Sequence, residues 1–102
     1  MLRTTAQRKV ICAECPMAKT ADLVGDTHAL LIVRDLLEKP RRFGELSASL
    51  TGVSTRTLTL KLQSLLKKDI VSHKEGLYTL TPKGKALRAV VRAMRSYGEK
   101  FL

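Results

Sequence analysis

The sequence predicts a mainly α-helical domain with one small β-hairpin, an α+β fold in which residues 1–102 form a single unit. Apolar residues recur at helical spacing along most of the chain. Two strand-like segments, "IVSH" and "LYTL", flank "KEG", and Gly76 suits the tight turn between them. A length of 102 residues allows one modest hydrophobic core but not two.

The first predicted helix begins at Pro16, because proline suits the first turn of a helix, and Cys15 then takes the N-cap position. The helix is expected to end near Gly25. Residues 1–14 before it have no clear apolar period and include Arg and Lys, so they predict a basic N-terminal arm.

A second helix is predicted over residues 28–39, where the apolar residues again keep helical spacing. Asp26 or Thr27 is suited to cap its first turn, and Pro40 is expected to end it.

Residues 41–43 are expected to form a short extended joint that leads into a short helix over residues 44–50. Residues 51–53 then predict a turn, in which Gly52 supplies backbone freedom.

The segment "TLTLKLQ" at residues 57–63 is ambiguous, because it alternates apolar and polar residues as a half-buried strand does. A helix over residues 54–68 accounts for more of the sequence. It makes Ser54 an N-cap, and it gathers four leucines on one face. These are Leu58, Leu62, Leu65 and Leu66. We therefore predict a helix.

In that helix Leu60 lies about 200° around the axis from Leu58, on the face opposite the core. No Asp or Glu occurs in residues 54–68, although a solvated helix face usually mixes Glu with Lys. Two interpretations remain: a merely polar face, or a surface that enters the DNA major groove, where Arg contacts guanine and Gln contacts adenine. The residues expected to contact DNA here are Ser54, Thr55, Arg56, Thr57, Thr59, Leu60, Lys61, Gln63, Ser64 and Lys67.

The order of these elements indicates a winged helix-turn-helix. A short helix, a turn and a longer helix with a cationic outer face form the helix-turn-helix over residues 44–68. The hairpin over residues 70–80 is then a short wing, with His73 and Lys74 near its tip as further candidates to contact DNA.

Thr81 and Pro82 predict the start of a last helix, over residues 82–102. Its apolar stripe suits a dimer interface, together with the first helix of the chain; packing onto the chain's own core and, less well supported, a membrane surface are the alternatives. The predicted interface residues are Leu87, Val90, Val91, Met94 and Tyr97.

The charge distribution points to a polyanionic partner. The net charge is +10, and residues 51–102 hold eleven basic and three acidic residues, against eight and six in residues 1–50. A concentrated basic half favours nucleic acid, here double-stranded DNA, although a solubilising surface would have the same composition. The sequence has no apolar run long enough for a membrane span or a signal peptide, so we expect a cytoplasmic protein with no membrane partner.

The chain resembles the HxlR-type regulators, a MarR-like group of small dimeric winged-helix DNA-binding proteins. The resemblance covers about residues 15–88 and rests on Cys15-Pro16, "LVGDTHALLIVRDLLEKPRRFGEL", "GVSTRTLTLKLQSLLKKDIV" and "YTLTPKGKAL". It implies a homodimer that binds a pseudo-palindrome, with half-sites about one helical turn apart.

The sequence departs from the family pattern in three places. "GDTH" at residues 25–28 replaces Gly-Gly-Lys-Trp, so His28 stands where the family has a large aromatic residue. Asp69 stands where a glycine usually ends the second helix of the helix-turn-helix. The wing is also several residues shorter, which puts the usual wing–DNA contacts in doubt.

Three interpretations of Cys15 stay open. The N-terminus of a helix lowers the pKa of a thiol, and the resemblance implies a redox or electrophile sensor, with Cys12 as a resolving partner. An inert thiol is the second interpretation. A zinc site is the third, because Cys12, Cys15 and His28 have the spacing of three zinc-finger ligands, but no histidine follows at residues 32–34, so no metal is expected.

Two function classes therefore remain. One is a sequence-specific transcriptional regulator; the other is a nonspecific basic winged-helix module that binds DNA or protein without an effector. The sequence offers no phosphate-binding glycine loop and no nucleophile with a base and an orienting group, so we expect neither an enzyme nor a cofactor, and no obligatory small-molecule ligand is evident.

Overall fold

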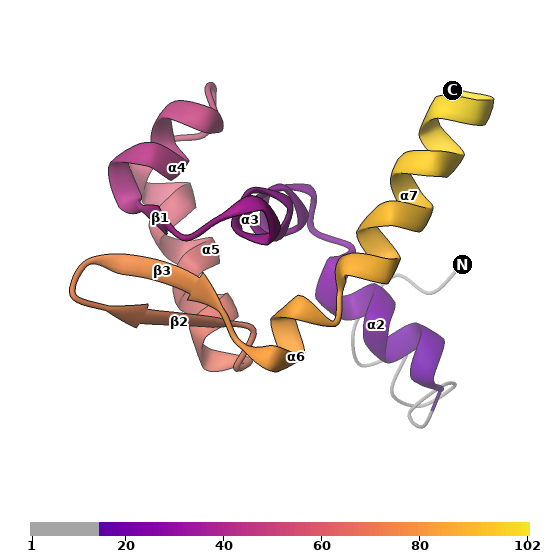
Figure 1. Ribbon diagram of the computed structural model, residues 1–102, viewed down its shortest axis with the longest axis horizontal. Coiled ribbons are helices and arrows are strands. Elements are labelled where there is room, and N and C mark those ends of the chain that lie inside the picture. Colours follow the sequence, from indigo (N-terminus) through magenta and orange to yellow (C-terminus); the bar gives the residue numbers. More distant parts are fainter. Residues whose placement is uncertain (1–14) are drawn as a thin grey trace.

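The computed structural model describes residues 15–102; the predicted basic arm, and Cys12 with it, lies outside the described residues. The elements follow the predicted order (Figure 1). They are α2 (Pro16–Val24), α3 (Thr27–Glu38), β1 (Arg41–Arg42), α4 (Phe43–Ser49), α5 (Thr55–Lys67), β2 (Val71–Lys74), β3 (Leu77–Leu80), α6 (Pro82–Lys85) and α7 (Arg88–Phe101).

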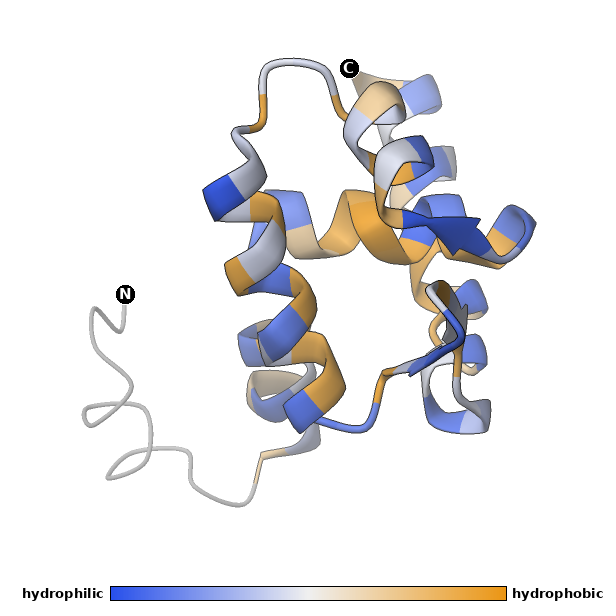
Figure 2. Cartoon of the chain, turned by 90° about the vertical axis from the view of Figure 1, so that its left-hand side faces the viewer, coloured by the Kyte–Doolittle hydropathy of each residue, from blue (hydrophilic) through white to orange (hydrophobic). Residues whose placement is uncertain are grey.

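Helix α3 lies at the centre of the fold and contacts α2, α4, α5, α7 and β3. It does so because its apolar residues occupy most of its circumference, and Ile32 is completely buried. Hydrophobic segments meet at this centre in Figure 2, and hydrophilic ones predominate at the periphery. The buried apolar core consists of Ala29, Ile32, Val33, Leu36, Leu46, Leu50, Leu58, Leu62, Leu65, Ile70, Val71, Leu80 and Leu87.

Three of the predicted helix starts, those of α3, α5 and α6, are confirmed by side-chain caps. The Asp26 carboxylate accepts a hydrogen bond from the Ala29 amide at 3.1 Å, and the Ser54 hydroxyl accepts one from the Thr57 amide at 3.1 Å. The Thr81 hydroxyl accepts one from the Gly84 amide, also at 3.1 Å. Each cap satisfies a backbone N–H that has no partner inside its own helix.

The β-sheet has three strands, whereas the sequence predicted two. Strands β2 and β3 form the expected hairpin, and β1, predicted as an extended joint, pairs antiparallel with the other side of β3. The pairing places Arg41 opposite Tyr78. Two residues pair here, too few to leave a strand pattern in the sequence.

The hairpin turn consists of Glu75 and Gly76, both with positive φ, at 53° and 78°. Positive φ at both central residues is typical of a type I′ turn, the connection that best matches the twist of two antiparallel strands. The Arg42 guanidinium donates a hydrogen bond to the Glu75 carbonyl at 3.2 Å, so β1 also braces the turn.

The prediction of a single last helix over residues 82–102 was wrong in one respect, because this segment is divided into two helices, α6 and α7. Gly84 lies so close to the carbonyl of Ile70 that a Cβ atom would stand 2.2 Å from that oxygen. The Leu87 side chain inserts into the core at the joint between the helices. Burial of Leu87 and the close approach of Gly84 therefore fix where the chain changes direction.

Candidate nucleic-acid interface

Helices α4 and α5 and the turn between them form the helix-turn-helix (Figure 1). At the start of α5 the Ser54 hydroxyl both accepts from the Thr57 amide and donates to the Thr57 hydroxyl, at 3.0 Å. Gly52 in the turn has φ of 92°, the left-handed conformation that the sequence predicted it to supply. The buried leucines Leu58, Leu62 and Leu65 hold α5 against the core.

The outer face of α5 lies in solvent, and the predicted position of Leu60 is confirmed. Its side chain is 54% exposed, whereas Leu58 and Leu62 on either side of it are 1% exposed. The predicted contact residues that are exposed are Ser54, Thr55, Arg56, Thr59, Leu60, Gln63 and Lys67, and those that are half-buried are Thr57, Lys61 and Ser64. The Thr59 hydroxyl donates to the Thr55 carbonyl at 2.8 Å.

Among the cationic residues of the predicted set, Lys61 is the one that forms an ion pair within the described part of the chain. Its ammonium group forms an ion pair with the carboxylate of Asp26, the residue that caps α3. The hydrogen bond from Lys61 is the main cause that holds the pKa of Asp26 below its ordinary value. The sequence did not predict this pair, because its members lie 35 residues apart and no local spacing relates them.

In the wing, His73 and Lys74 are both exposed at the end of β2. The His73 ring stacks on the Tyr78 ring of β3, with centroids 4.0 Å apart and planes 1° from parallel. Stacking fixes the imidazole against the strand, whereas the Lys74 side chain makes no aromatic contact within residues 15–102. The turn itself adds one acidic side chain, that of Glu75.

Cys15 is half-buried in the N-cap position of α2, as predicted, and its carbonyl accepts a hydrogen bond from the Lys19 amide at 3.1 Å. His28 is half-buried in the first turn of α3. Within residues 15–102 no three His, Cys, Asp or Glu side chains are grouped closely enough to hold a metal ion.

The predicted interface stripe of the last helix is divided between core and solvent. Leu87 is buried in the core of its own chain, and Val90 and Val91 are half-buried against that core. Met94 and Tyr97 are 47% and 60% exposed. The sequence prediction missed Phe101, 64% exposed, although its spacing from Tyr97 continues the stripe.

Across the described part of the chain, no helix combines the length and the apolar character that a bilayer crossing requires.

Residues 23–102 match the family described as HxlR-like helix-turn-helix. The chain is 33% identical to the uncharacterized HTH-type transcriptional regulator sll1512 of Synechocystis, over 86% of this chain and 70% of that protein. It is 32% identical to the HTH-type transcriptional regulator YodB of Bacillus subtilis, over 85% of each.

Solved structures agree with these relatives. Quinone-bound YodB of B. subtilis superposes with a TM-score of 0.80 and 34% identity, over 85% of this chain and all of that one. The redox regulator HypR in its reduced form gives a TM-score of 0.74 and 27% identity, over 83% of this chain and 91% of that one.

Proposed function

The chain belongs to the HxlR-like family of helix-turn-helix transcriptional regulators, and from this we propose that it acts in the cytoplasm as a homodimer on a pseudo-palindromic operator. The observation that carries the proposal is the outer face of α5. There Arg56, Leu60 and Gln63 stand in solvent, on a helix with no acidic residue. A leucine side chain exposed to water does not stabilise the fold. In the major groove it can pack against a thymine methyl group, while the neighbouring Arg and Gln form hydrogen bonds with bases.

The exposed end of α7 supports the homodimer. Met94, Tyr97 and Phe101 expose apolar surface on one side of this helix, and the Tyr97 and Phe101 rings lie 5.0 Å apart. Exposed apolar side chains gathered in this way are typical of a surface covered by a partner. A second copy of the chain would bring two α5 helices to half-sites roughly 34 Å apart, one turn of DNA.

Fluorescence anisotropy tests sequence-specific binding. The labelled probe is the DNA beside the protein's own gene, compared with a random duplex of equal length at about 150 mM salt. We expect the operator to bind roughly 10³-fold more tightly than random DNA. A ratio near one would leave the nonspecific basic module as the function of the chain.

Arg56→Ala tests direct contact by α5. We expect it to lower affinity for the operator by about 1–3 kcal/mol and to relax preference at one base position, because one guanidinium can contact one guanine. Lys85→Ala in α6 removes the same charge from an exposed position outside the helix-turn-helix and should change binding little. Equal weakening by Arg56→Ala on every DNA sequence would exclude base contact by Arg56.

We further propose that Cys15 makes the regulator responsive to oxidants or electrophiles. Cys15 is in the N-cap position of α2, and helix N-termini in general favour the thiolate form of a cysteine. Among relatives, YodB has been obtained with a bound quinone and HypR is described as a redox regulator. A quinone or a mild thiol oxidant should change the operator affinity of the wild type but not that of Cys15→Ser. Cys12→Ser should still respond to the quinone, which adds to Cys15 itself, and should lose the response to the oxidant if Cys12 is the resolving partner. If Cys12→Ser fails to respond to the quinone as well, both thiols are needed; if the wild type does not respond, Cys15 is an inert thiol.

A further inference from the structure

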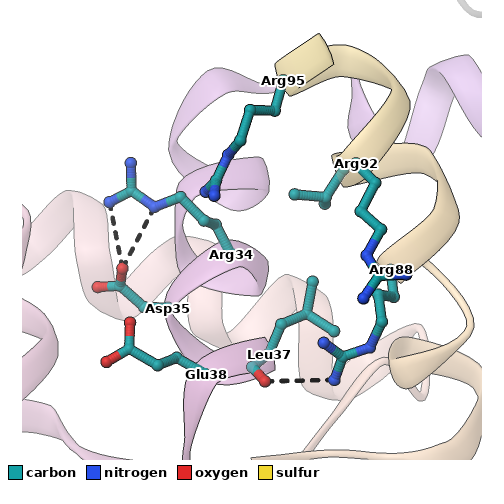
Figure 3. Close-up of a pocket in the computed structure, with 8 residues that line it drawn as sticks. Arg34, Asp35, Leu37, Glu38, Arg88, Arg92 and Arg95 are labelled. Carbon is teal, nitrogen blue, oxygen red and sulfur yellow. Dashed lines mark hydrogen bonds and ion pairs between the residues drawn. The ribbon is translucent and has the colours of Figure 1, made fainter.

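A pocket of about 510 Å³ lies between α3 and α7. Figure 3 shows the side chains of Arg88, Arg92 and Arg95 on α7 and that of Arg34 on α3, whose guanidinium points toward Asp35. All four arginines line the pocket. Aliphatic side chains of Leu37 and Val91 complete its wall. This volume falls within the range typical of small-molecule sites, about 300–1,000 Å³.

Two carboxylates, those of Asp35 and Glu38, also line the pocket, and each is paired through one of its oxygens. Asp35, 5% exposed, accepts from the Arg34 guanidinium at 3.1 Å. The Glu38 carboxylate pairs with Arg41, outside the pocket, at 3.3 Å. Within residues 15–102, neither acid therefore forms an ion pair with an arginine of α7, and the second oxygen of Asp35, Oδ2, is buried without a hydrogen-bond partner.

The three arginines of α7 have few hydrogen-bond or ion-pair partners within residues 15–102. Arg88 donates one hydrogen bond to the Leu37 carbonyl at 3.4 Å. Arg92 and Arg95 have no hydrogen-bond or ion-pair partner among residues 15–102. Arginines at spacings of four and three residues lie on one side of a helix, where like charges repel one another. A bound anion would relieve this repulsion.

We propose that this pocket binds a small polyanion, a molecule with at least two carboxylate or phosphate groups. Guanidinium groups form paired hydrogen bonds with these groups, which favours oxyanions over halide ions. Several converging guanidiniums favour two or more acidic groups over one. Helix α7, which carries three of the pocket's arginines, lies on the far side of α3 from α5 and the wing (Figure 1), so these arginines are not placed to contact DNA held by α5.

Isothermal titration calorimetry of the full chain, without DNA, tests the site. The probes are citrate and pyrophosphate, with acetate as the monoanion, all at one ionic strength balanced with sodium chloride. Citrate or pyrophosphate should bind saturably, and acetate should not. Arg92→Gln and Arg95→Gln should each lower the affinity for citrate or pyrophosphate roughly tenfold or more, because each substitution removes a charge-assisted hydrogen bond. Both side chains are exposed and without a partner in the described chain, so the variants should fold.

Lys85→Gln, the same change of charge outside the pocket, is the matched control and should bind the probes as the wild type does. Equal weakening in all three variants, or no saturable binding of either polyanion, would overturn the proposal. Displacement of citrate by short random duplex DNA would also overturn it, because the arginines would then belong to a DNA-binding surface. None of these readouts depends on an operator, so they stand apart from the test of sequence-specific regulation.

Discussion

Asp69 adopts a backbone conformation that side chains rarely take. It follows the end of α5 and has φ of 61°, in the left-handed region that glycine favours. The HxlR-type pattern has glycine at this position, and the structure gives the physical reason. Aspartate is among the few other residues that tolerate this conformation, so the chain keeps the same turn at some cost in free energy.

Replacing Asp69 with glycine should stabilise the fold. A side chain in the left-handed region costs roughly 1–2 kcal/mol of stability, and replacing it with glycine removes this cost. Glycine, however, loses about 0.5–1 kcal/mol of stability through its greater freedom in the unfolded chain, so the net gain is smaller. We expect Asp69→Gly to raise the free energy of unfolding by up to about 1 kcal/mol, measured by urea denaturation. Lys68→Gly, at a neighbour with φ of −84°, should lower it instead. Equal losses from the two substitutions would show that the conformation carries no strain.

The ion pair of Asp26 with Lys61 should make stability depend on pH in the acid range. Because the pKa of Asp26 is lowered in the folded state, the pair stabilises the fold above the unfolded-state value, near 3.9. That stabilisation is lost as the pH falls through the lower folded-state pKa. Asp26→Asn keeps a good N-cap and removes the charge.

We expect Asp26→Asn to cost roughly 0.5–1 kcal/mol at pH 7, a value limited by partial exposure of the pair to solvent, and almost nothing at pH 2. Chemical denaturation at both pH values measures the difference. Glu99→Gln, an exposed carboxylate on α7, should show little change at either pH. A cost for Asp26→Asn that persists unchanged at pH 2 would exclude the charge as its origin.

Single-residue features were predictable where they depend on near neighbours. Ser54 as a cap and Leu60 as an exposed leucine follow from spacing within one helix, since the position around the axis is fixed by residue number. The pairing of Lys61 and the crowding at Gly84 were not predictable, because both partners come from distant parts of the chain. Asp69 lies between these cases: the departure from the family pattern was visible, and its φ was not.

Among the elements, the joint between α6 and α7 depends on a close approach of backbones. A Cβ atom at Gly84 would stand 2.2 Å from the Ile70 carbonyl oxygen and 3.0 Å from a methyl group of Leu80. Backbone atoms cannot move aside as a flexible side chain can, so Gly84→Ala should lower the free energy of unfolding by about 1–3 kcal/mol. Thermal denaturation monitored by circular dichroism measures the loss.

Gly44→Ala in α4 is the matched control, because among the described residues no atom beyond its chain neighbours and its own helix backbone lies within 4 Å of the added Cβ. It should leave stability unchanged or raise it by up to about 1 kcal/mol. Wild-type stability of Gly84→Ala would mean that α6 can shift away from the Ile70 carbonyl at little cost in free energy.

The elements themselves were predicted well, because most of them are long enough to show a period. The helix over residues 54–68 and the hairpin follow from apolar spacing and from the glycine at the turn. The third strand did not, since two paired residues show no alternation. The break between α6 and α7 also escaped prediction, because the apolar stripe continues across it and only the core determines where Leu87 must lie.

For the whole molecule, assembly should depend on the exposed end of α7. Tyr97→Asp places a charge where a partner would bury it, so we expect this variant to be a monomer. Operator binding should then weaken, because a monomer contacts one half-site and not two. Sedimentation velocity measures the change of mass. Leu60→Asp is the control. It likewise places a charge on an exposed apolar position, but on α5, and should reduce DNA binding with no change in the mass of the dimer. A dimer that survives Tyr97→Asp would place the interface elsewhere.

The central position of α3 has a consequence for the order in which the molecule opens. Its backbone amides are enclosed by contacts with α2, α4, α5, α7 and β3, so they can exchange with heavy water only when the whole domain unfolds. The outer end of α7 has no buried residue in the isolated chain, and its amides should exchange within local fluctuations. If the chain forms a dimer, the exchange rate of the α7 amides should fall as the protein concentration rises, whereas that of the α3 amides should not. Hydrogen exchange along α7 therefore measures self-association directly.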